Sequence, residues 1–144
     1  MMYRIRIVDG TDEEVAENIR DLHELTFGNT APQIDPESGW WWIVYDGREL
    51  AGFCGLMPAT GTAGYAYFNR VGVLAQHRGN GLQKRLMRAM EAKARKLGFV
   101  AIVSDTTSDN PASANNMIAC GYRLYWPEVP WALSYSIYFR KELQ

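Results

Sequence analysis

The stretch that decides the fold is VGVLAQHRGNGLQK, residues 71–84. Its first residues complete an apolar strand, its middle is a turn that contains Gly79 and Gly81, and its end opens a basic helix. The first turn of a helix carries backbone N–H groups without partners and the positive end of the helix dipole. Glycines let a diphosphate approach that backbone without a side-chain clash. The stretch therefore predicts a binding site for a phosphorylated ligand.

Two familiar phosphate-binding motifs do not fit this stretch. The dinucleotide fingerprint requires a third glycine, and Lys84 stands at that position. The P-loop requires four residues between its glycines and then a Lys-Ser or Lys-Thr pair, and neither is present. A different phosphate-binding family is therefore indicated.

Outward from this stretch, the hydrophobic pattern predicts a mixed α/β fold. A strand at 65–74 leads into a helix at 81–97 and a buried strand at 99–104, which together make a strand–helix–strand crossover. The Asp46-Gly47 pair predicts a hairpin, so the early strands are expected to be antiparallel. The length of 144 residues and the lack of a linker or repeat predict one domain, 1–144. The other predicted elements are strands at 3–8, 40–45, 50–57, 122–126 and 133–140, a helix after residue 12 and a helix at 110–120.

Composition indicates a globular protein, because 47% of the residues are hydrophobic. The N-terminus alternates charged and apolar residues instead of forming the apolar run of a signal peptide, and no apolar run is long enough to span a bilayer. Cys54 and Cys120 have no metal-binding or redox spacing, so two reduced core thiols are expected. We therefore expect a cytoplasmic protein that does not bind a membrane.

Charge is unevenly distributed, although the formal net charge is only −1. Residues 1–49 carry eleven acidic and four basic side chains, whereas seven bases and one acid lie between Arg78 and Lys96. This basic segment would attract a phosphorylated ligand, although a solvated helix face is the simpler explanation of the charge alone. A nucleic-acid-binding helix is not favoured, because the chain has neither a recognition motif nor an overall basic charge.

With these residues in view, the sequence resembles the GNAT superfamily of N-acetyltransferases. The family's signature is Gln/Arg-x-x-Gly-x-Gly/Ala after an apolar strand. Two registers fit it, and these are Gln76-x-x-Gly79-x-Gly81 and Arg78-x-x-Gly81-x-Gln83. The second register keeps the family's usual distance from the strand, but it places Gln83 where glycine or alanine is commoner.

A second segment, DTTSDNPASANNMIACGY at residues 105–122, strengthens the resemblance. It is similar to the family's Asn-x-x-(Ala/Ser)-x-x-x-(Tyr)-x-x-x-Gly-(Phe/Tyr) pattern, on which Asn110, Ser113, Gly121 and Tyr122 fall. The two motifs in this order are much more specific than either alone. The resemblance implies a mainly antiparallel central sheet with helices on both faces and a splayed strand pair that holds the cofactor.

The resemblance implies acetyl-coenzyme A as the cosubstrate. Free backbone groups at residues 71–73 would pair with the pantetheine amides like an added strand. The Val73 N–H could also stabilise the thioester oxyanion. Backbone N–H groups of residues 79–84 would hold the pyrophosphate. The cofactor-binding residues expected in this way are Val71, Gly72, Val73, Arg78, Gly79, Asn80, Gly81, Leu82, Gln83, Lys84 and Asn110.

Direct acetyl transfer to an amine requires a base for the amine proton and an acid for the leaving thiolate. Many family members place a tyrosine as the acid where this chain has Met117, so Tyr122, Tyr67 or water is expected to replace it. Asp105 aligns with a carboxylate near the end of the fifth strand in some relatives, and capping the following turn is its alternative role. Tyr67 stands where other relatives carry a glutamate, and a place on the sheet face is its simpler role. The candidate catalytic residues are therefore Asp105, Tyr67 and Tyr122.

The two histidines do not point to catalysis or to a metal. His77 is expected in a surface loop next to the first motif, and His23 on the polar or partly buried side of the first helix. No cluster of histidine, cysteine and carboxylate is visible in the sequence, so no metal is expected.

The acceptor is expected to be a primary amine of a small molecule or a protein. The acidic first helix and the 28–39 loop lie where the family builds its acceptor site, which suggests a cationic amine. The five tryptophans are expected to be mostly core residues. A non-catalytic acyl-CoA-binding module is the alternative function, because Met117 cannot give a proton. The strands at 122–140 would also allow a homodimer.

Overall fold

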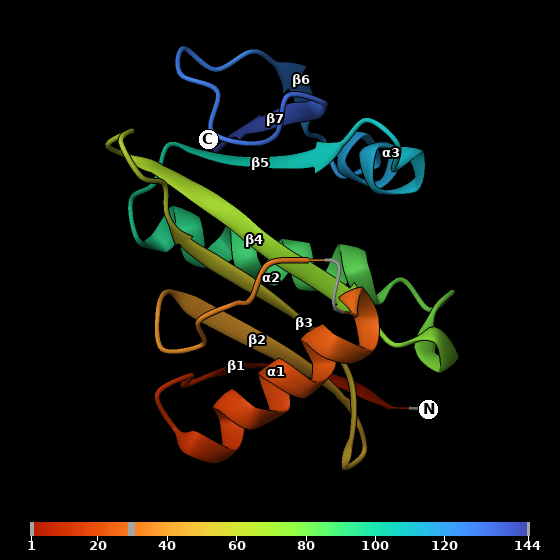
Figure 1. Ribbon diagram of the computed structural model, residues 1–144. Helices are drawn as coiled ribbons and strands as arrows, with labels where there is room; N and C mark the ends of the chain where they lie inside the picture. Colours follow the sequence, from red (N-terminus) through yellow and green to blue (C-terminus); the bar gives the residue numbers. More distant parts are fainter. Residues whose placement is uncertain (1, 29–30, 144) are drawn as a thin grey trace.

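The computed structural model describes residues 2–28 and 31–143, which form one seven-stranded sheet with helices packed on it (Figure 1). The strands are β1 (Tyr3–Val8), β2 (Trp40–Asp46), β3 (Glu49–Pro58), β4 (Tyr65–Val73), β5 (Ala101–Thr107), β6 (Arg123–Tyr125) and β7 (Ser136–Glu142). The helices are α1 (Glu13–Phe27), α2 (Leu82–Lys96) and α3 (Pro111–Ala119), and a short 3₁₀ helix, η1 (Ala75–His77), precedes α2.

The order of the strands in the sheet is β1-β2-β3-β4-β5-β7-β6. Within the described residues, all neighbouring strands are antiparallel except β4 and β5, which are parallel. Helix α2 connects these two strands, as the predicted crossover requires. The predicted order of elements and the mainly antiparallel sheet are therefore confirmed.

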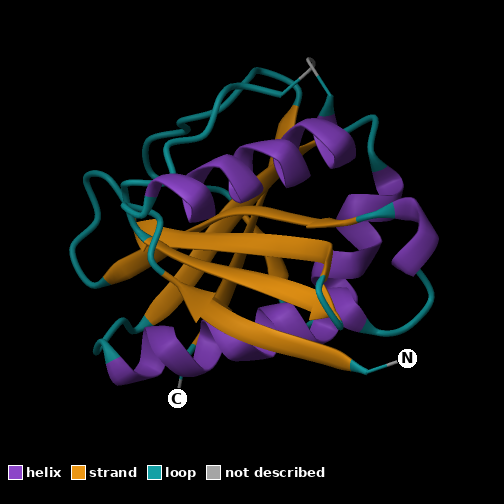
Figure 2. Cartoon of the chain, turned by 90° about the horizontal axis from the view of Figure 1, so that it is seen from below, coloured by secondary structure: helices purple, strands orange, loops and turns teal. Residues whose placement is uncertain are grey.

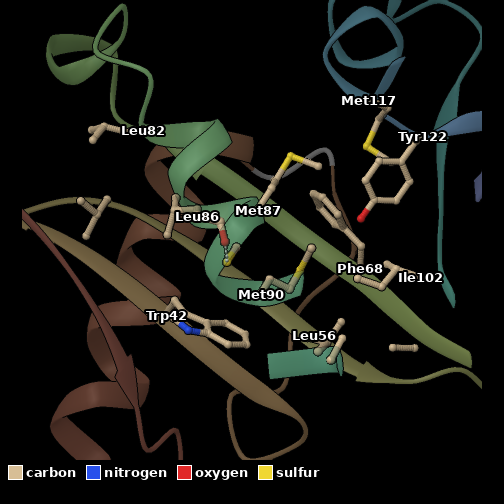
Figure 3. Close-up of a cluster of buried hydrophobic side chains, with 14 of the residues drawn as sticks. Trp42, Leu56, Phe68, Leu82, Leu86, Met87, Met90, Ile102, Met117 and Tyr122 are labelled. Carbon is tan, nitrogen blue, oxygen red and sulfur yellow. Dashed lines mark hydrogen bonds between the residues drawn. The ribbon is translucent and has the colours of Figure 1, made fainter. Parts of the chain in front are cut away.

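Helices cover both faces of the sheet, as Figure 2 shows. Strand β2 explains this arrangement, because its run of apolar residues is buried on both sides. Trp41 packs with Ile19 of α1 on one face, whereas Trp42 packs with Met90 of α2 on the other. Figure 3 shows the larger of these two cores, which also holds Met117 and other residues from the β5–β7 side of the sheet.

The predicted bounds of the later strands were wrong by several residues. Strand β5 begins at Ala101, not at residue 99, because the Phe99 N–H still bonds to the Ala94 carbonyl at the end of α2. The Val100 N–H bonds to the Gly64 carbonyl, just before the first paired residues of β4 and β5. It continues through the polar residues up to Thr107, whose backbone pairs with β7. Pairing with a neighbouring strand, and not apolar side chains, therefore sets the end of β5.

Three expectations about single residues have different outcomes. Neither Cys54, which is buried, nor Cys120, which is half-buried, forms a disulfide, as expected. His77 was predicted in a surface loop, and this was wrong, since only 4% of it is exposed. The Tyr3 hydroxyl lies 3.1 Å from His77 Nδ1, which joins η1 to the edge strand β1.

Across residues 2–28 and 31–143, no helix combines the length and apolar character needed to cross a membrane.

Candidate active site

Strands β4 and β5 stay together only briefly before they separate. Their parallel pairing covers three residue pairs and ends where Tyr67 faces Val103, whereas β4 continues to Val73. At the point of separation, the buried Ser104 hydroxyl donates a hydrogen bond of 2.9 Å to the Phe68 carbonyl. From this point the two strands diverge, as Figure 1 shows to the right of the paired part, and we call the gap between their backbones the opening.

A β-bulge on β4 lies at the start of this opening. Gly55 of β3 faces Arg70, but the next residue of β3, Leu56, faces Phe68, so Asn69 is the extra residue on β4. A bulge bends its strand and increases the local twist. The bulge therefore accounts for the direction in which β4 leaves β5.

Beyond the bulge, the edge of β4 that faces the opening has free backbone groups. The Leu74 N–H donates to Ala51 on β3, and successive residues of a strand direct their N–H groups to opposite sides. The N–H groups of Val71 and Val73 therefore point into the opening. The Val73 carbonyl accepts a bond of 3.3 Å from the Arg78 side chain. An extended chain with its own amide groups could pair with this edge.

Gly72 serves the packing of α1 on this strand. A Cβ atom added to Gly72 would lie 2.6 Å from the Thr26 hydroxyl of α1 and 2.8 Å from the Phe53 ring. Any larger residue would push α1 away from the sheet. This requirement is separate from the expected role of the Gly72 backbone beside the cofactor.

The turn before α2 presents a row of unpaired N–H groups. Gly79 and Gly81 have φ angles of 81° and 70°, which residues with a side chain rarely adopt. The first backbone bond of the helix runs from Arg85 N–H to the Gly81 carbonyl. In the described part of the chain, none of the six N–H groups of residues 79–84 has a hydrogen-bond partner. These groups and the helix dipole form a site suited to an anion.

Side-chain hydrogen bonds hold this turn in place, whereas its basic side chains remain available to a ligand. The Asn80 side chain donates to the carbonyls of His77 and Arg78, at 3.0 and 3.3 Å. The Gln83 side chain accepts a bond of 3.2 Å from Asn116 on α3. The exposed side chains of Lys84, Arg85 and Arg88 form no ion pair with any described residue.

Asn110 lies at the far side of the opening, where β5 ends and α3 begins. It is the N-cap of α3, because its side-chain oxygen accepts a bond of 3.2 Å from the Ser113 N–H. Its side-chain amide N–H groups form no bond with a described residue. Asn110 can therefore cap the helix and donate to a ligand at the same time.

Two of the three candidate catalytic residues are joined by a hydrogen bond. The Tyr67 hydroxyl donates to Asp105 Oδ1 at 2.8 Å, and the Trp131 indole N–H donates to the same oxygen at 3.0 Å. Asp105 Oδ2 has no partner among the described residues and remains able to accept a proton. Burial, and then the nearby Asp105 carboxylate, raise the pKa of Tyr67 far above its usual value, so this tyrosine stays protonated. Trp131 was missed in the sequence, because no spacing connects it to Asp105.

Tyr122 lies apart from this pair, in the core beneath α2 and α3. Only 1% of it is exposed, and its hydroxyl has no hydrogen-bond partner in the described structure. Burial, and then the charge of Glu91, raise the pKa of this hydroxyl well above its usual value. Figure 3 shows the Met117 thioether beside the Tyr122 ring and the hydroxyl directed towards Phe68, the residue at which the opening begins.

Both histidines form contacts that the sequence did not predict. His23 lies over β4, where its Nε2 atom is 3.4 Å from Arg70 Nε, and burial followed by the Arg70 charge lowers the pKa of His23. Asp46, Glu49 and His77 offer potential metal ligands that lie within 4.8 Å of one another. Glu49 is largely exposed. The expected absence of a metal stays a prediction.

Comparisons with known proteins agree with this architecture. The sequence profile of the Acetyltransferase (GNAT) family matches residues 2–122. N-acetyltransferase 8B from Rattus norvegicus is 24% identical over 119 residues, which cover 78% of the chain and 53% of that protein. The chain thus spans about half the length of this relative.

Solved structures show the same fold over the full chain. A GNAT-family protein from Desulfovibrio desulfuricans has a TM-score of 0.82 at 14% identity, with 99% of this chain and 100% of that chain covered. The yncA protein from Salmonella typhimurium, solved with its cofactor acetyl-CoA, has a TM-score of 0.73 at 17% identity, with 100% and 95% covered. The family profile covers most of the sequence, and the sheet opening and the glycine turn have the arrangement that its motifs imply; the chain belongs to the Acetyltransferase (GNAT) family.

Proposed function

We propose that the chain transfers the acetyl group of acetyl-CoA directly to a primary amine. The observation that carries this proposal is the row of six unpaired N–H groups at residues 79–84, next to an opening in the sheet. One end of the site suits a pyrophosphate, and the other suits a chain of amides. Acetyl-CoA has both parts and supplies a thioester whose carbonyl an amine can attack.

The chain's own residues account for how such a ligand would be held. The N–H groups of the turn would bind the pyrophosphate oxygens, and the exposed cations Lys84, Arg85 and Arg88 would add charge attraction. Val71 and Val73 would pair with the amide arm, and the amide group of Asn110 would donate to it from the opposite side. The Val73 N–H is also a fixed donor for an oxyanion at the opening.

Asp105 is the proposed base. Its Oδ1 atom is held by Tyr67 and Trp131, whereas Oδ2 is free to take a proton from the acceptor's ammonium group, directly or through a water molecule, and this leaves the neutral amine that attacks the thioester. Tyr67 is then a positioning residue, because its proton is directed at Asp105. Tyr122 is the proposed acid, since its hydroxyl is protonated and has no bond to break before it gives up that proton.

Calorimetric titration with acetyl-CoA tests the binding site. We expect acetyl-CoA and free CoA to bind, and ATP, which lacks the amide arm, to bind far more weakly. Gly81→Ala should weaken acetyl-CoA binding by tenfold or more, because it strains the turn that aligns the N–H groups. Gly98→Ala is the matched control, since Gly98 has a φ of 85° and open space around it at the other end of α2. An equal loss of acetyl-CoA binding in both variants would contradict the proposed role of the turn at residues 79–84.

A non-catalytic acyl-CoA-binding module is the second candidate function. It is favoured by Met117, which is buried beside Tyr122 and has no proton to give. Asp105→Asn separates the two functions, because an enzyme should lose most of its turnover while its affinity for acetyl-CoA stays the same. A chain that binds acetyl-CoA tightly but acetylates no amine before the substitution would be such a module.

The remaining features of the proposal concern the chain as a whole. We propose that residues 1–144 work as one catalytic unit, because one sheet and the helices packed on it carry the whole site. We also propose that this unit works in the cytoplasm without nucleic acid, membrane or metal, as the sequence predicts. A homodimer is supported by the edge strand β6, where Leu124 is exposed. Sedimentation of the purified protein would distinguish a dimer from a monomer.

A further inference from the structure

A cavity of about 810 Å³ lies beside the candidate base. Ala66 and Phe68 of β4 point into the core under α2, so Tyr65 and Tyr67, which alternate with them along the strand, point to the opposite face of the sheet. The floor of the cavity contains these two tyrosines and Val103 of β5. Its walls are the β3–β4 turn at 58–62 and the segment 125–131.

The inner end of the cavity meets the site where the acetyl group would be transferred. Tyr67 and Trp131 line the cavity and are also the two donors to Asp105. The strands separate directly after Tyr67 and Val103, so the floor ends where the opening begins. A molecule in the cavity could therefore place an amine next to both Asp105 and the opening.

The lining of the cavity is mainly aromatic. Tyr65, Tyr67, Tyr125, Trp126 and Trp131 contribute rings, and the Tyr67 and Trp131 rings meet edge to face with centroids 6.4 Å apart. Trp126 is 71% exposed and Trp131 is 44% exposed, an unusual amount for such large apolar side chains. These rings provide surfaces on which a flat apolar group could pack.

The charges at the cavity suit a ligand with an ammonium group. Arg140 is the basic residue of the lining, and it forms an ion pair with Glu142 and stacks 4.8 Å from the Tyr65 ring. The exposed Glu128 carboxylate lies in the wall, and Asp105 lies at the inner end.

We propose that the acceptor is a primary amine carried on an aromatic ring system, with its ring among Tyr67, Trp126 and Trp131 and its amine directed at Asp105. This inference rests on the proposed acetyl transfer and narrows its substrate. The choice of acceptor would then depend on the cavity and not on the acidic helix α1 or the 28–39 loop, because no described residue of either segment lines the cavity. Amines that carry a ring are preferred over amines without one.

A comparison of acceptors tests the inference with acetyl-CoA held at saturation. Phenethylamine and tryptamine should have a kcat/KM at least about tenfold higher than butylamine or spermidine, because ring packing contributes beyond the buried area. Turnover that favours butylamine or spermidine would overturn the aromatic acceptor while leaving acetyl transfer intact. No turnover with any of the four amines, from a protein that still binds acetyl-CoA, would overturn the aromatic acceptor, and acetyl transfer would then be tested on protein amino-termini.

Two variants connect the preference to the cavity. Trp126→Ala should raise the KM for tryptamine several-fold and should lower kcat/KM for tryptamine much more than kcat/KM for butylamine. Tyr135→Ala is the matched control, because Tyr135 is an exposed aromatic residue of the same part of the chain that does not line the cavity. An equal effect of both variants on tryptamine would show that the ring binds elsewhere and would overturn the assignment.

Discussion

Replacing Tyr122 by phenylalanine is expected to make the protein more stable and less active. The Tyr122 hydroxyl is buried without a partner, and an unsatisfied buried hydroxyl costs about 1–3 kcal/mol. Removing it leaves only a very small void, so Tyr122→Phe should raise the free energy of unfolding by about 1 kcal/mol. For a domain of this size, that gain corresponds to an increase in Tm of about 2–4 °C. If the hydroxyl is the acid, kcat for acetyl transfer should fall in the same variant.

Thermal unfolding followed by circular dichroism gives the first quantity, and steady-state turnover gives the second. The ligand-free protein must be used for unfolding, because bound acetyl-CoA would add its own stabilisation. A fall in Tm would refute the reasoning, since it would mean that the hydroxyl makes a stabilising bond in solution. A rise in Tm with unchanged kcat would leave the packing argument intact and remove Tyr122 from the reaction, so that the thiolate leaves unaided or takes its proton from water.

Three other changes test separate parts of the structure. Gly72→Ala should destabilise the protein by about 1–3 kcal/mol in urea unfolding, because the new methyl group overlaps the Thr26 hydroxyl; an unchanged midpoint would show that α1 lies further from β4. Glu91→Gln should cost roughly 1–3 kcal/mol in the same assay, because it leaves the Lys141 ammonium 2.8 Å from a neutral group inside the protein; the double variant with Lys141→Met should recover part of that loss. The raised pKa of Tyr67 adds stability below the ordinary tyrosine pKa of about 10, and this stability is lost as the pH rises above that value. Urea unfolding of Tyr67→Phe across the same pH range should therefore show a smaller loss, and an identical loss would place Tyr67 in contact with solvent.

Local patterns in the sequence were sufficient for the architecture. Asp46-Gly47 fixed one hairpin, and the glycines at 79 and 81 indicated where a strand ends and α2 begins. The order of elements needs only such local signals and the handedness of the crossover. The bounds of β5 needed more, because its polar end is a strand only through its pairing with β7.

Features of the candidate site formed by neighbouring residues were visible in the sequence, whereas contacts between residues distant in the sequence were not. The turn that is proposed to bind phosphate is one continuous segment, so its glycines and cations were visible in order. The contact of Asp105 with Trp131 joins residues 26 positions apart, and no periodicity connects them. The burial of His77 likewise depends on Tyr3 and other residues distant in sequence, which come together only when β1 completes the sheet.

The brief pairing of β4 with β5 also affects how the protein would respond to its ligand. Among the described residues, three residue pairs, the Val100 N–H bond to the Gly64 carbonyl and the Ser104 side-chain bond join the β1–β4 part of the sheet to the β5–β7 part, and α2 packs across both. A ligand that pairs with β4 in the opening and with α3 across it would fasten these two parts together. Ligand binding should therefore slow amide hydrogen exchange in β7 as well as in β5, although β7 does not border the opening, and would make the two parts unfold as one cooperative unit.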